Sequence, residues 1–361
     1  MQISEKNGRN PYFSVNKILK FILLNKKKYC IFFLAIFSIV LFVVSFTFGK
    51  YHISSGDLLY IFYAKIFGLK QTWSQEVDLV VFHVRLPRII AAMLVGSVLA
   101  ISGTTFQAIF KNPLVAPDIL GASAGASFGA ALGIFFKFNL IGIQLTAFIF
   151  GITAVGVTYA ISRIVGNGTN ITLVLILAGM VIAEFFGALV SLIQYLADPA
   201  NMLQQAIGFW LMGGLSTLTM QDVVISFIPM IVGIIVILLL RWKLNVISFG
   251  DEEAEALGIN VLLLRFILIF CTTMITSASV AIGGIIGWVG LIIPNMARII
   301  FGSNFKVLIP ASMLLGCSFL LLVDDAVRTI FSVDVPIGIF TALIGGPVFA
   351  FVLLKDRDRI T

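Results

Sequence analysis

The chain has 361 residues, of which 60% are apolar and only 11% are charged. An average soluble domain is about 45–50% apolar and about 25% charged, so this composition excludes a water-soluble globular fold. The formal net charge is +7, but the basic residues lie mainly in short segments between apolar runs. That distribution is typical of membrane topology and argues against a nucleic-acid-binding protein. We therefore expect an all-α, polytopic membrane protein.

Apolar runs divide the chain into candidate spans, because a membrane-spanning helix needs roughly 20 mostly apolar residues. The runs predict about ten transmembrane helices within one domain, residues 29–355. The spans are expected near residues 29–48, 88–110, 118–136, 140–162, 172–196, 222–240, 262–281, 284–301, 307–323 and 336–354. Glycines between the seventh and eighth runs predict a sharp turn and a half-length helix, which is tolerated where backbone packs on protein or lines a cavity.

Lysine and arginine set the expected orientation. The arm formed by residues 1–28 is basic, and the tail formed by residues 356–361 carries Arg357 and Arg359. An even number of spans places both segments in the cytoplasm together with most of the 24 basic residues. The positive-inside rule therefore predicts an N-in/C-in topology, and we assign the arm no role beyond this.

An acidic segment, residues 248–260, separates the sixth and seventh runs. Ser248 and the aspartate three residues later resemble a capping box, which predicts a short helix that begins at Ser248. Gly258 is placed to end that helix. A solvated loop is one interpretation. A docking helix for a soluble partner is favoured, because Ala254 and Leu257 also give the segment an apolar side.

Three arginines lie at the expected outer boundary. Arg85 and Arg88 precede the second run, and Arg328 follows Asp324 by four residues, a spacing that allows a pair on one helix face. Arginine on the outside opposes the positive-inside trend. These side chains either anchor the protein at the interface or bind carboxylates of an extracellular protein in bidentate pairs. The charges alone leave both roles open.

Two features concern a pathway through the protein. Residues 111–117 join the second and third spans and contain two prolines, which makes the segment stiff and non-helical. It is either a simple connecting loop between the two helices or part of an inner gate. Glu184 lies deep within the fifth span, and carboxylates inside a membrane usually face a cavity or a partner. It either lines the pathway or is protonated and bonded to a neighbour such as Ser191 or Gln194.

Several stretches, in order over roughly residues 50 to 355, resemble the FecCD-type permeases of ABC importers, which carry iron–siderophores, haem and cobalamin. The matching stretches are residues 85–88 with the small-residue helix that follows, Gln107, residues 112–114, 121–125, 208–215, 256–258 and 287–294, Asp324 with Arg328, and residues 336–338 and 345–347. Each stretch is weak alone, and together they are specific. Asn295, Asp325 and Glu184 depart from the family pattern.

The resemblance implies a type II importer permease with ten helices in the cytoplasmic membrane of a prokaryote. It implies as partners a second permease subunit, identical or related, two cytosolic ATPase subunits and an extracytoplasmic binding protein. By position, Arg85, Arg88 and Arg328 correspond to docking arginines for the binding protein, and Asn112, Leu114 and Thr172 to a cytoplasmic gate. The ATPase coupling segment corresponds to Gly250, Asp251, Glu252, Glu253, Ala254, Glu255, Leu257 and Gly258.

Other classes of protein fit less well. No Gly-x-x-x-x-Gly-Lys-[Ser/Thr] run is present, so we expect a transport subunit that is not an enzyme, with ATP and Mg²⁺ used by the partner ATPase. Neither a cofactor nor a metal is expected on this chain. A secondary transporter would need ionisable residues near the bilayer midplane, and only Glu184 qualifies. An iron–siderophore is the favoured cargo, with haem, cobalamin and molybdate left open.

Overall fold

The computed structural model describes residues 29–166, 171–198 and 202–355, and these residues form helices joined by loops, with no strand among them. The predicted arm, residues 1–28, and tail, residues 356–361, lie outside the described residues. Six helical stretches within the described part are long and apolar enough to cross a membrane, and four shorter apolar helices accompany them. The all-α character predicted from the sequence is confirmed.

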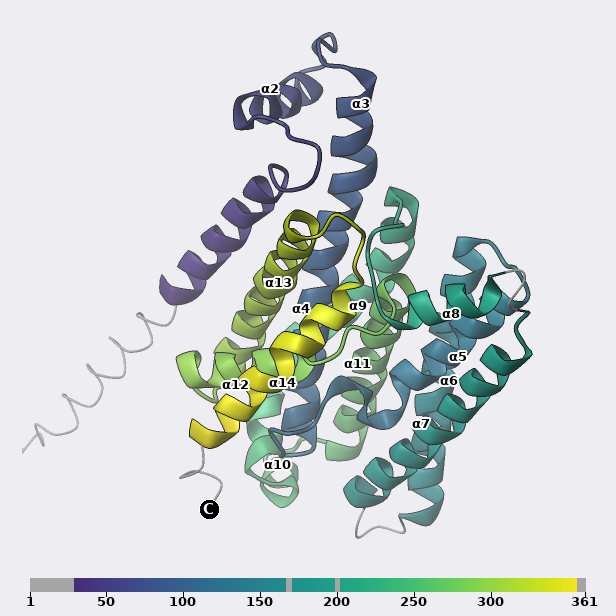
Figure 1. The fold of residues 1–361 in the computed structure, drawn as a ribbon. Helices are drawn as coiled ribbons and strands as arrows, with labels where there is room; N and C mark the ends of the chain where they lie inside the picture. The colour runs from purple at the N-terminus through teal and green to yellow at the C-terminus, as the bar shows by residue number, and fades with distance from the viewer. Residues whose placement is uncertain (1–28, 167–170, 199–201, 356–361) are drawn as a thin grey trace, which may run out of the picture.

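The helices follow one another in a simple order (Figure 1). They are Tyr29–Ser45, α2 (Ser55–Ile66), α3 (Gln75–Asp78), the π-helix η1 (Leu79–Arg85), α4 (Leu86–Ile109), the 3₁₀ helix η2 (Pro117–Leu120), α5 (Ala122–Phe135), α6 (Leu140–Val165), α7 (Ile171–Leu196), α8 (Leu203–Leu211), α9 (Met220–Phe249), α10 (Asp251–Ala256), α11 (Val261–Gly283), α12 (Val289–Phe301), α13 (Phe305–Ile330) and α14 (Ile337–Lys355).

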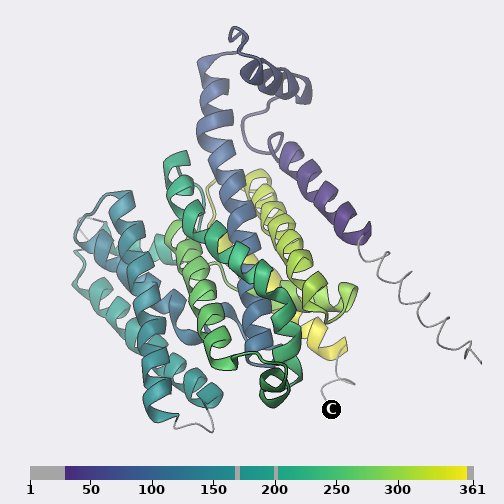
Figure 2. The same ribbon diagram turned by 180° about the vertical axis from the view of Figure 1, so that it is seen from behind.

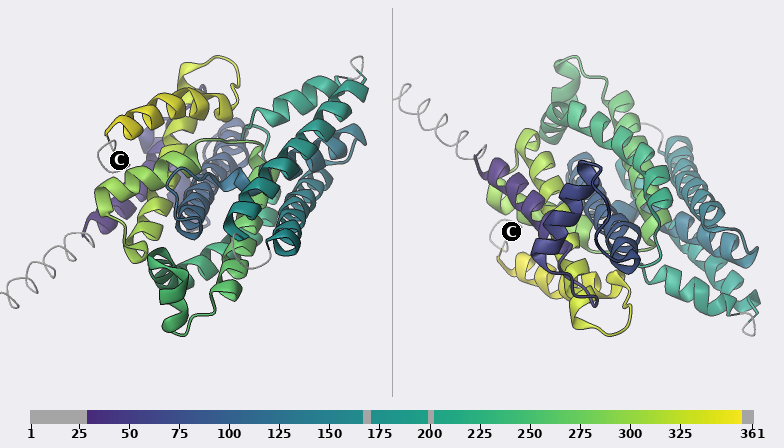
Figure 3. Two further views of the ribbon diagram at one scale, coloured as in Figure 1. Left: turned by 90° about the horizontal axis from the view of Figure 1, so that it is seen from below. Right: turned by 90° about the horizontal axis from the view of Figure 1, so that it is seen from above.

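Helix α4 is the centre of the bundle and packs against α9, α11, α12 and α13. Helices α5, α6 and α7 form a second group that α11 joins to the first, and the views from behind and along the bundle show this division (Figures 2 and 3). Small residues allow the close contacts that packing in lipid requires. A Cβ at Gly96 would lie 2.2 Å from the carbonyl oxygen of Gly316, so α4 and α13 touch through their backbones.

Two ends of the bundle can be distinguished in Figure 1. Helices α2 and α3 lie at one end, and α10 and the end of α14 lie at the other. Under the predicted topology the α2 end is the outer end and the α10 end is the inner end. We use these two names below.

Predicted span limits were close in some places and wrong in others. The second span begins at Gln75 and not near Arg88, because α3 and the π-helix η1 continue without a break into α4. The third span is shorter than predicted, because Gly121 adopts a left-handed conformation (φ 87°) before α5 begins. The sixth extends to Phe249. The predicted turn before a half-length helix is confirmed: Gly284 has φ 65°, and α12 has 13 residues.

Candidate functional site

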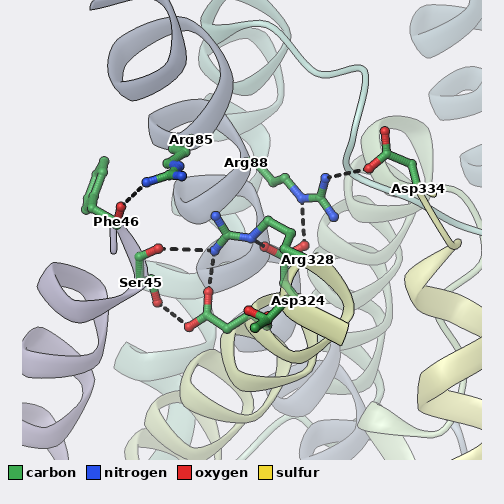
Figure 4. A network of polar contacts seen from close by, with 9 residues as sticks. Ser45, Phe46, Arg85, Arg88, Asp324, Arg328 and Asp334 are labelled. Carbon is green, nitrogen blue, oxygen red and sulfur yellow. Dashed lines mark hydrogen bonds and ion pairs between the residues drawn. The ribbon is translucent and has the colours of Figure 1, made fainter. Parts of the chain in front are cut away.

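The three predicted docking arginines meet at the outer end, where α13 packs against α4 (Figure 4). Arg88 Nε donates to Asp324 Oδ1 at 2.7 Å, and Arg328 Nε lies 2.9 Å from Asp324 Oδ2. Arg85, Arg88 and Arg328 are 4%, 6% and 8% exposed, and Asp324 is fully buried. The predicted pairing of Asp324 with Arg328 is confirmed, and the same carboxylate ties α13 to α4.

The first helix is attached to this cluster through its last residues. Asp325 accepts hydrogen bonds from Arg328 and from the hydroxyl of Ser45, the latter at 2.5 Å. Arg85 donates to the carbonyl oxygen of Phe46, as Figure 4 shows. Asp325 therefore has a clear structural role as a second counter-charge for Arg328.

A hollow of about 240 Å³ opens beside the cluster, and all three arginines line it together with Lys50. Asp334 stands at its rim, 3.7 Å from Arg88 Nη1, and its side chain is 60% exposed. Arg328 Nη1 has no hydrogen-bond partner among the described residues. The arginines that line the hollow are hydrogen-bond donors, and such groups pair with carboxylates. The structure brings the three arginines together, and their docking role stays a prediction.

The coupling segment differs from its predicted form at its start. Helix α10 begins at Asp251, whereas Ser248 lies inside α9 and donates its hydroxyl to the carbonyl oxygen of Asn245 at 2.7 Å. The predicted capping box at Ser248 is therefore wrong, because nothing interrupts α9 before the extended backbone of Gly250. The predicted end is confirmed, since Gly258 has φ 75°.

The apolar residues of the segment point in two directions. Ala254 is buried against the protein, whereas Leu257 is 71% exposed. Glu252, Glu253 and Glu255 are exposed as well. The segment is thus anchored on one side and offers a leucine among carboxylates on the other, which suits a soluble partner.

Asp251 connects three parts of the inner end. Its Oδ1 atom accepts from Lys111 Nζ at 3.3 Å and from Arg265 Nη2 at 2.9 Å. Lys111 begins the predicted gate segment, and Arg265 belongs to α11. The first residue of the coupling helix is therefore bonded directly to the segment that holds Asn112 and Leu114.

Polar side chains of α4 and α12 hold the other side of the gate segment. Asn295 Nδ2 donates to the carbonyl oxygen of Pro113 at 3.0 Å, and Arg298 donates to Asn295 Oδ1 at 2.9 Å and to Gln107 Oε1 at 2.8 Å. Asn112 Oδ1 accepts from the backbone N–H of Leu114 at 2.9 Å, which forms a local turn. Leu114 is left exposed at the tip of this turn.

The remaining predicted pathway residues lie on α7. Thr172 lines a hollow of about 560 Å³ together with Asp251 and Arg265, and Asn112 and Leu114 are not among the residues that line it. Glu184 is exposed in the middle of α7. No hydrogen bond joins Glu184 to Ser191 or Gln194 in the described structure, and the Ser191 hydroxyl donates to the carbonyl oxygen of Gly187.

Sequence reasoning missed several of these contacts. Ser45, Lys111 and Arg265 were not singled out, and Gln107 and Arg298 carried no predicted role. One signal was available: Lys111 begins the gate segment, and four carboxylates lie in the inner segment 248–260, so attraction between the two was foreseeable. The partners of Ser45 and Gln107 are far away in the chain, and no local pattern indicates them.

Comparisons with known proteins agree with this architecture. The FecCD transport family matches residues 36–355. The molybdate import system permease protein of Haemophilus influenzae is 39% identical over 325 residues, which cover 90% of this chain and 95% of that protein. The hemin transport system permease protein of Yersinia pestis is 32% identical over 298 residues, covering 80% of this chain and 88% of that protein.

A solved structure is similar over nearly the whole chain. It shows the inward-facing conformation of an ABC transporter that was assigned to the metal-chelate type, with a TM-score of 0.80 and 37% identity, and the match covers 91% of this chain and 99% of that one. This similarity confirms the expected importer permease fold. The chain therefore belongs to the FecCD transport family and is a multi-pass permease subunit of an ABC importer in a prokaryotic cell membrane.

Proposed function

We propose that this chain and a second permease subunit form the pathway of an importer for a ferric chelate, with an iron–siderophore as the favoured cargo. An extracytoplasmic binding protein delivers the cargo to the outer end. Separate cytosolic ATPases use ATP and Mg²⁺ at the inner end. Similarity to the metal-chelate transporter and to the hemin permease supports a metal chelate as the cargo class.

The hollow at the outer end supports the proposal that a binding protein docks there. Three arginines line it, and Arg328 Nη1 is buried without a hydrogen-bond partner in the described part of the chain. A carboxylate from a docked protein that enters this hollow would pair with the arginines that line it, through an orienting, charge-assisted bond. Lys50 adds a further positive charge to the same hollow.

At the inner end, the contacts of Asp251 support a route from the ATPases to the gate. The exposed Leu257 and the glutamates of α10 suit a socket on an ATPase. A shift of α10 on ATP binding would move Asp251, and Asp251 is bonded to Lys111 at the start of the gate segment. Leu114, exposed at the tip of that segment, would then move with it.

Transport in proteoliposomes tests the proposal. Vesicles would hold this chain with its ATPase and its binding protein, and radioactive iron would be supplied as a siderophore chelate. We expect uptake that needs all three proteins and ATP on the inner side. Uptake by the permease alone, driven by a proton or sodium gradient and lost on Glu184→Gln, would overturn the proposal in favour of a secondary transporter.

Molybdate is the second candidate cargo. The molybdate permease of Haemophilus influenzae matches 90% of this chain at 39% identity, a higher identity than the hemin permease shows. The same vesicles supplied with radioactive molybdate separate the two candidates. Uptake of molybdate without uptake of iron would support the importer proposal and overturn the assignment of a ferric chelate as its cargo.

A further inference from the structure

Helix α7 has a broad side that no other described helix covers. It packs on α5 and α6, and Figure 1 shows it with α8 at one side of the molecule. The large apolar side chains of its uncovered side are Leu173, Leu177, Met180, Val181, Phe185, Leu192, Tyr195 and Leu196. In a membrane protein such a side faces either lipid or another subunit.

Glu184 lies in the middle of this uncovered side and of the 26-residue helix. It forms no hydrogen bond or ion pair with the described residues around it. A carboxylate at this depth is not stable against lipid and normally faces the interior of a bundle or a water-filled cavity. The surroundings that Glu184 requires must therefore come from outside this chain.

Further polar and small residues extend from Glu184 toward the outer end of α7. Gly187 and Ser191 follow it at helical spacing and are exposed, and Gln194 comes next. On α8, which packs against α5 and α7, Gln204 is exposed as well. A lipid-facing surface would carry apolar side chains here. Glu184, Gly187 and Ser191 instead interrupt the apolar side chains on this side of α7, as the lining of a water-filled pathway would.

We propose that Glu184 lines the pathway between this chain and the second permease subunit and selects the cargo by charge. Its carboxylate favours cationic or neutral metal chelates and disfavours oxyanions, because a charged side chain in a narrow, partly dehydrated passage acts strongly on a passing ion. This inference rests on the proposed importer function. It also predicts that molybdate is not the cargo of this chain, although a molybdate permease is a close relative.

Accessibility of the position gives the first test. Glu184→Cys and, as a matched control, Ile235→Cys would be made in a chain whose Cys30, Cys271 and Cys317 are replaced by alanine. Ile235 is exposed near the middle of α9 in apolar surroundings. In the assembled transporter, a cationic, water-soluble methanethiosulfonate reagent should modify the Glu184→Cys variant at least about 10-fold faster than the Ile235→Cys variant, because only the thiol of the former faces water. Equal, slow modification of the two variants would overturn the pathway assignment.

Cargo charge gives the second test. Ferric chelates built on one scaffold with net charges of +1, 0 and −1 would be offered to proteoliposomes containing the complete transporter. Wild type should transport the +1 chelate about 10-fold faster than the −1 chelate, Glu184→Gln should remove the difference, and Glu184→Lys should reverse it. Glu184→Asp should keep the wild-type order.

The outcomes separate the two proposals. ATP-dependent uptake with the same charge order in wild type, Glu184→Gln and Glu184→Lys would overturn selection by Glu184 and leave the importer intact. Uptake that does not depend on ATP would overturn the importer itself. Binding of each chelate to the binding protein, measured separately, ensures that the charge order arises in the permease.

Discussion

Charged side chains are held in opposite ways at the two ends of the molecule. At the outer end, Arg88, Asp324 and Arg328 are all less than one tenth exposed and are bonded to one another. At the inner end, the side chains of Lys111 and Asp251 are each 41% exposed, and their atoms are 3.3 Å apart. Both clusters join segments that are distant in the sequence, but only one of them is shielded from water.

Burial determines what each cluster can do. Removing one partner of a buried ion pair leaves an uncompensated charge and costs about 3–5 kcal/mol, so the outer cluster holds α4, α13 and the first helix in one arrangement. An exposed pair contributes about 0–1 kcal/mol and can break and re-form easily. The outer end is therefore suited to a fixed docking surface, and the inner end is suited to a joint that moves in every transport cycle.

Loss of Asp324 should have the largest effect. Asp324→Ala leaves Arg88 and Arg328 buried without their shared carboxylate, and we expect the free energy of unfolding to fall by about 3–5 kcal/mol. Denaturation of the purified protein in detergent micelles would measure this. Asp334→Ala is the control, because its carboxylate is mostly exposed and should change stability by less than about 0.5 kcal/mol. Similar values for the two variants would show that water reaches the outer cluster.

Removal of the link between α10 and the gate should impair transport and leave stability nearly unchanged. Lys111→Met deletes one bond to Asp251, and we expect uptake per ATP hydrolysed to fall about 10-fold, while the free energy of unfolding changes by less than about 1 kcal/mol. Lys306→Met is the matched control, since Lys306 is an exposed inner lysine with no ion pair in the described structure. An unchanged ratio of uptake to hydrolysis in Lys111→Met would rule out Asp251 as the connection.

The difference between the two ends also explains what could be read from the sequence. Asp324 and Arg328 pair at a spacing of four on one helix, so their contact followed from helical geometry. The bond from Arg88 to Asp324 spans 236 positions, and it depends on how α4 and α13 cross. The limits of α7 were predicted within one residue, because its apolar run is bounded by polar residues on both sides.

The local cap pattern at Ser248 predicted the wrong helix start, because the continuation of α9 determines the structure there. Ser248 has the residue type of a helix cap, but the segment before Gly250 contains no helix breaker, so α9 continues through it. The free side of α7 is a different case. The sequence identified Glu184 as unusual, and the structure showed that its neighbours within the chain leave it without a partner.

A smaller effect is expected where polar contacts hold the gate segment. Asn295→Ala removes the hydrogen bond to Pro113 and the bond that Asn295 accepts from Arg298, which should cost about 1 kcal/mol for each bond and loosen the segment. Leakage of trapped chelate from vesicles without ATP should therefore increase. Asn139→Ala removes the N-cap of α6 at the other end of the bundle, with a cost of the same order, about 1 kcal/mol. If both variants leak equally, general destabilisation and not the gate is responsible.

Salt should give the smallest effect, and it tests the contrast directly. Raising the ionic strength inside the vesicles from about 0.1 M to about 1 M shortens the screening length from about 10 Å to about 3 Å. The half-exposed bond between Lys111 and Asp251 should weaken, so uptake per ATP hydrolysed should fall by up to about twofold in wild type, whereas the buried outer cluster should be unaffected. Lys111→Met lacks the bond and should show no such fall, which separates this effect from salt acting on the ATPases. An equal fall in both proteins would mean that the bond between Lys111 and Asp251 does not couple ATP hydrolysis to transport. The difference between a fixed outer end and a moving inner end would then be supported only by the burial of the two clusters.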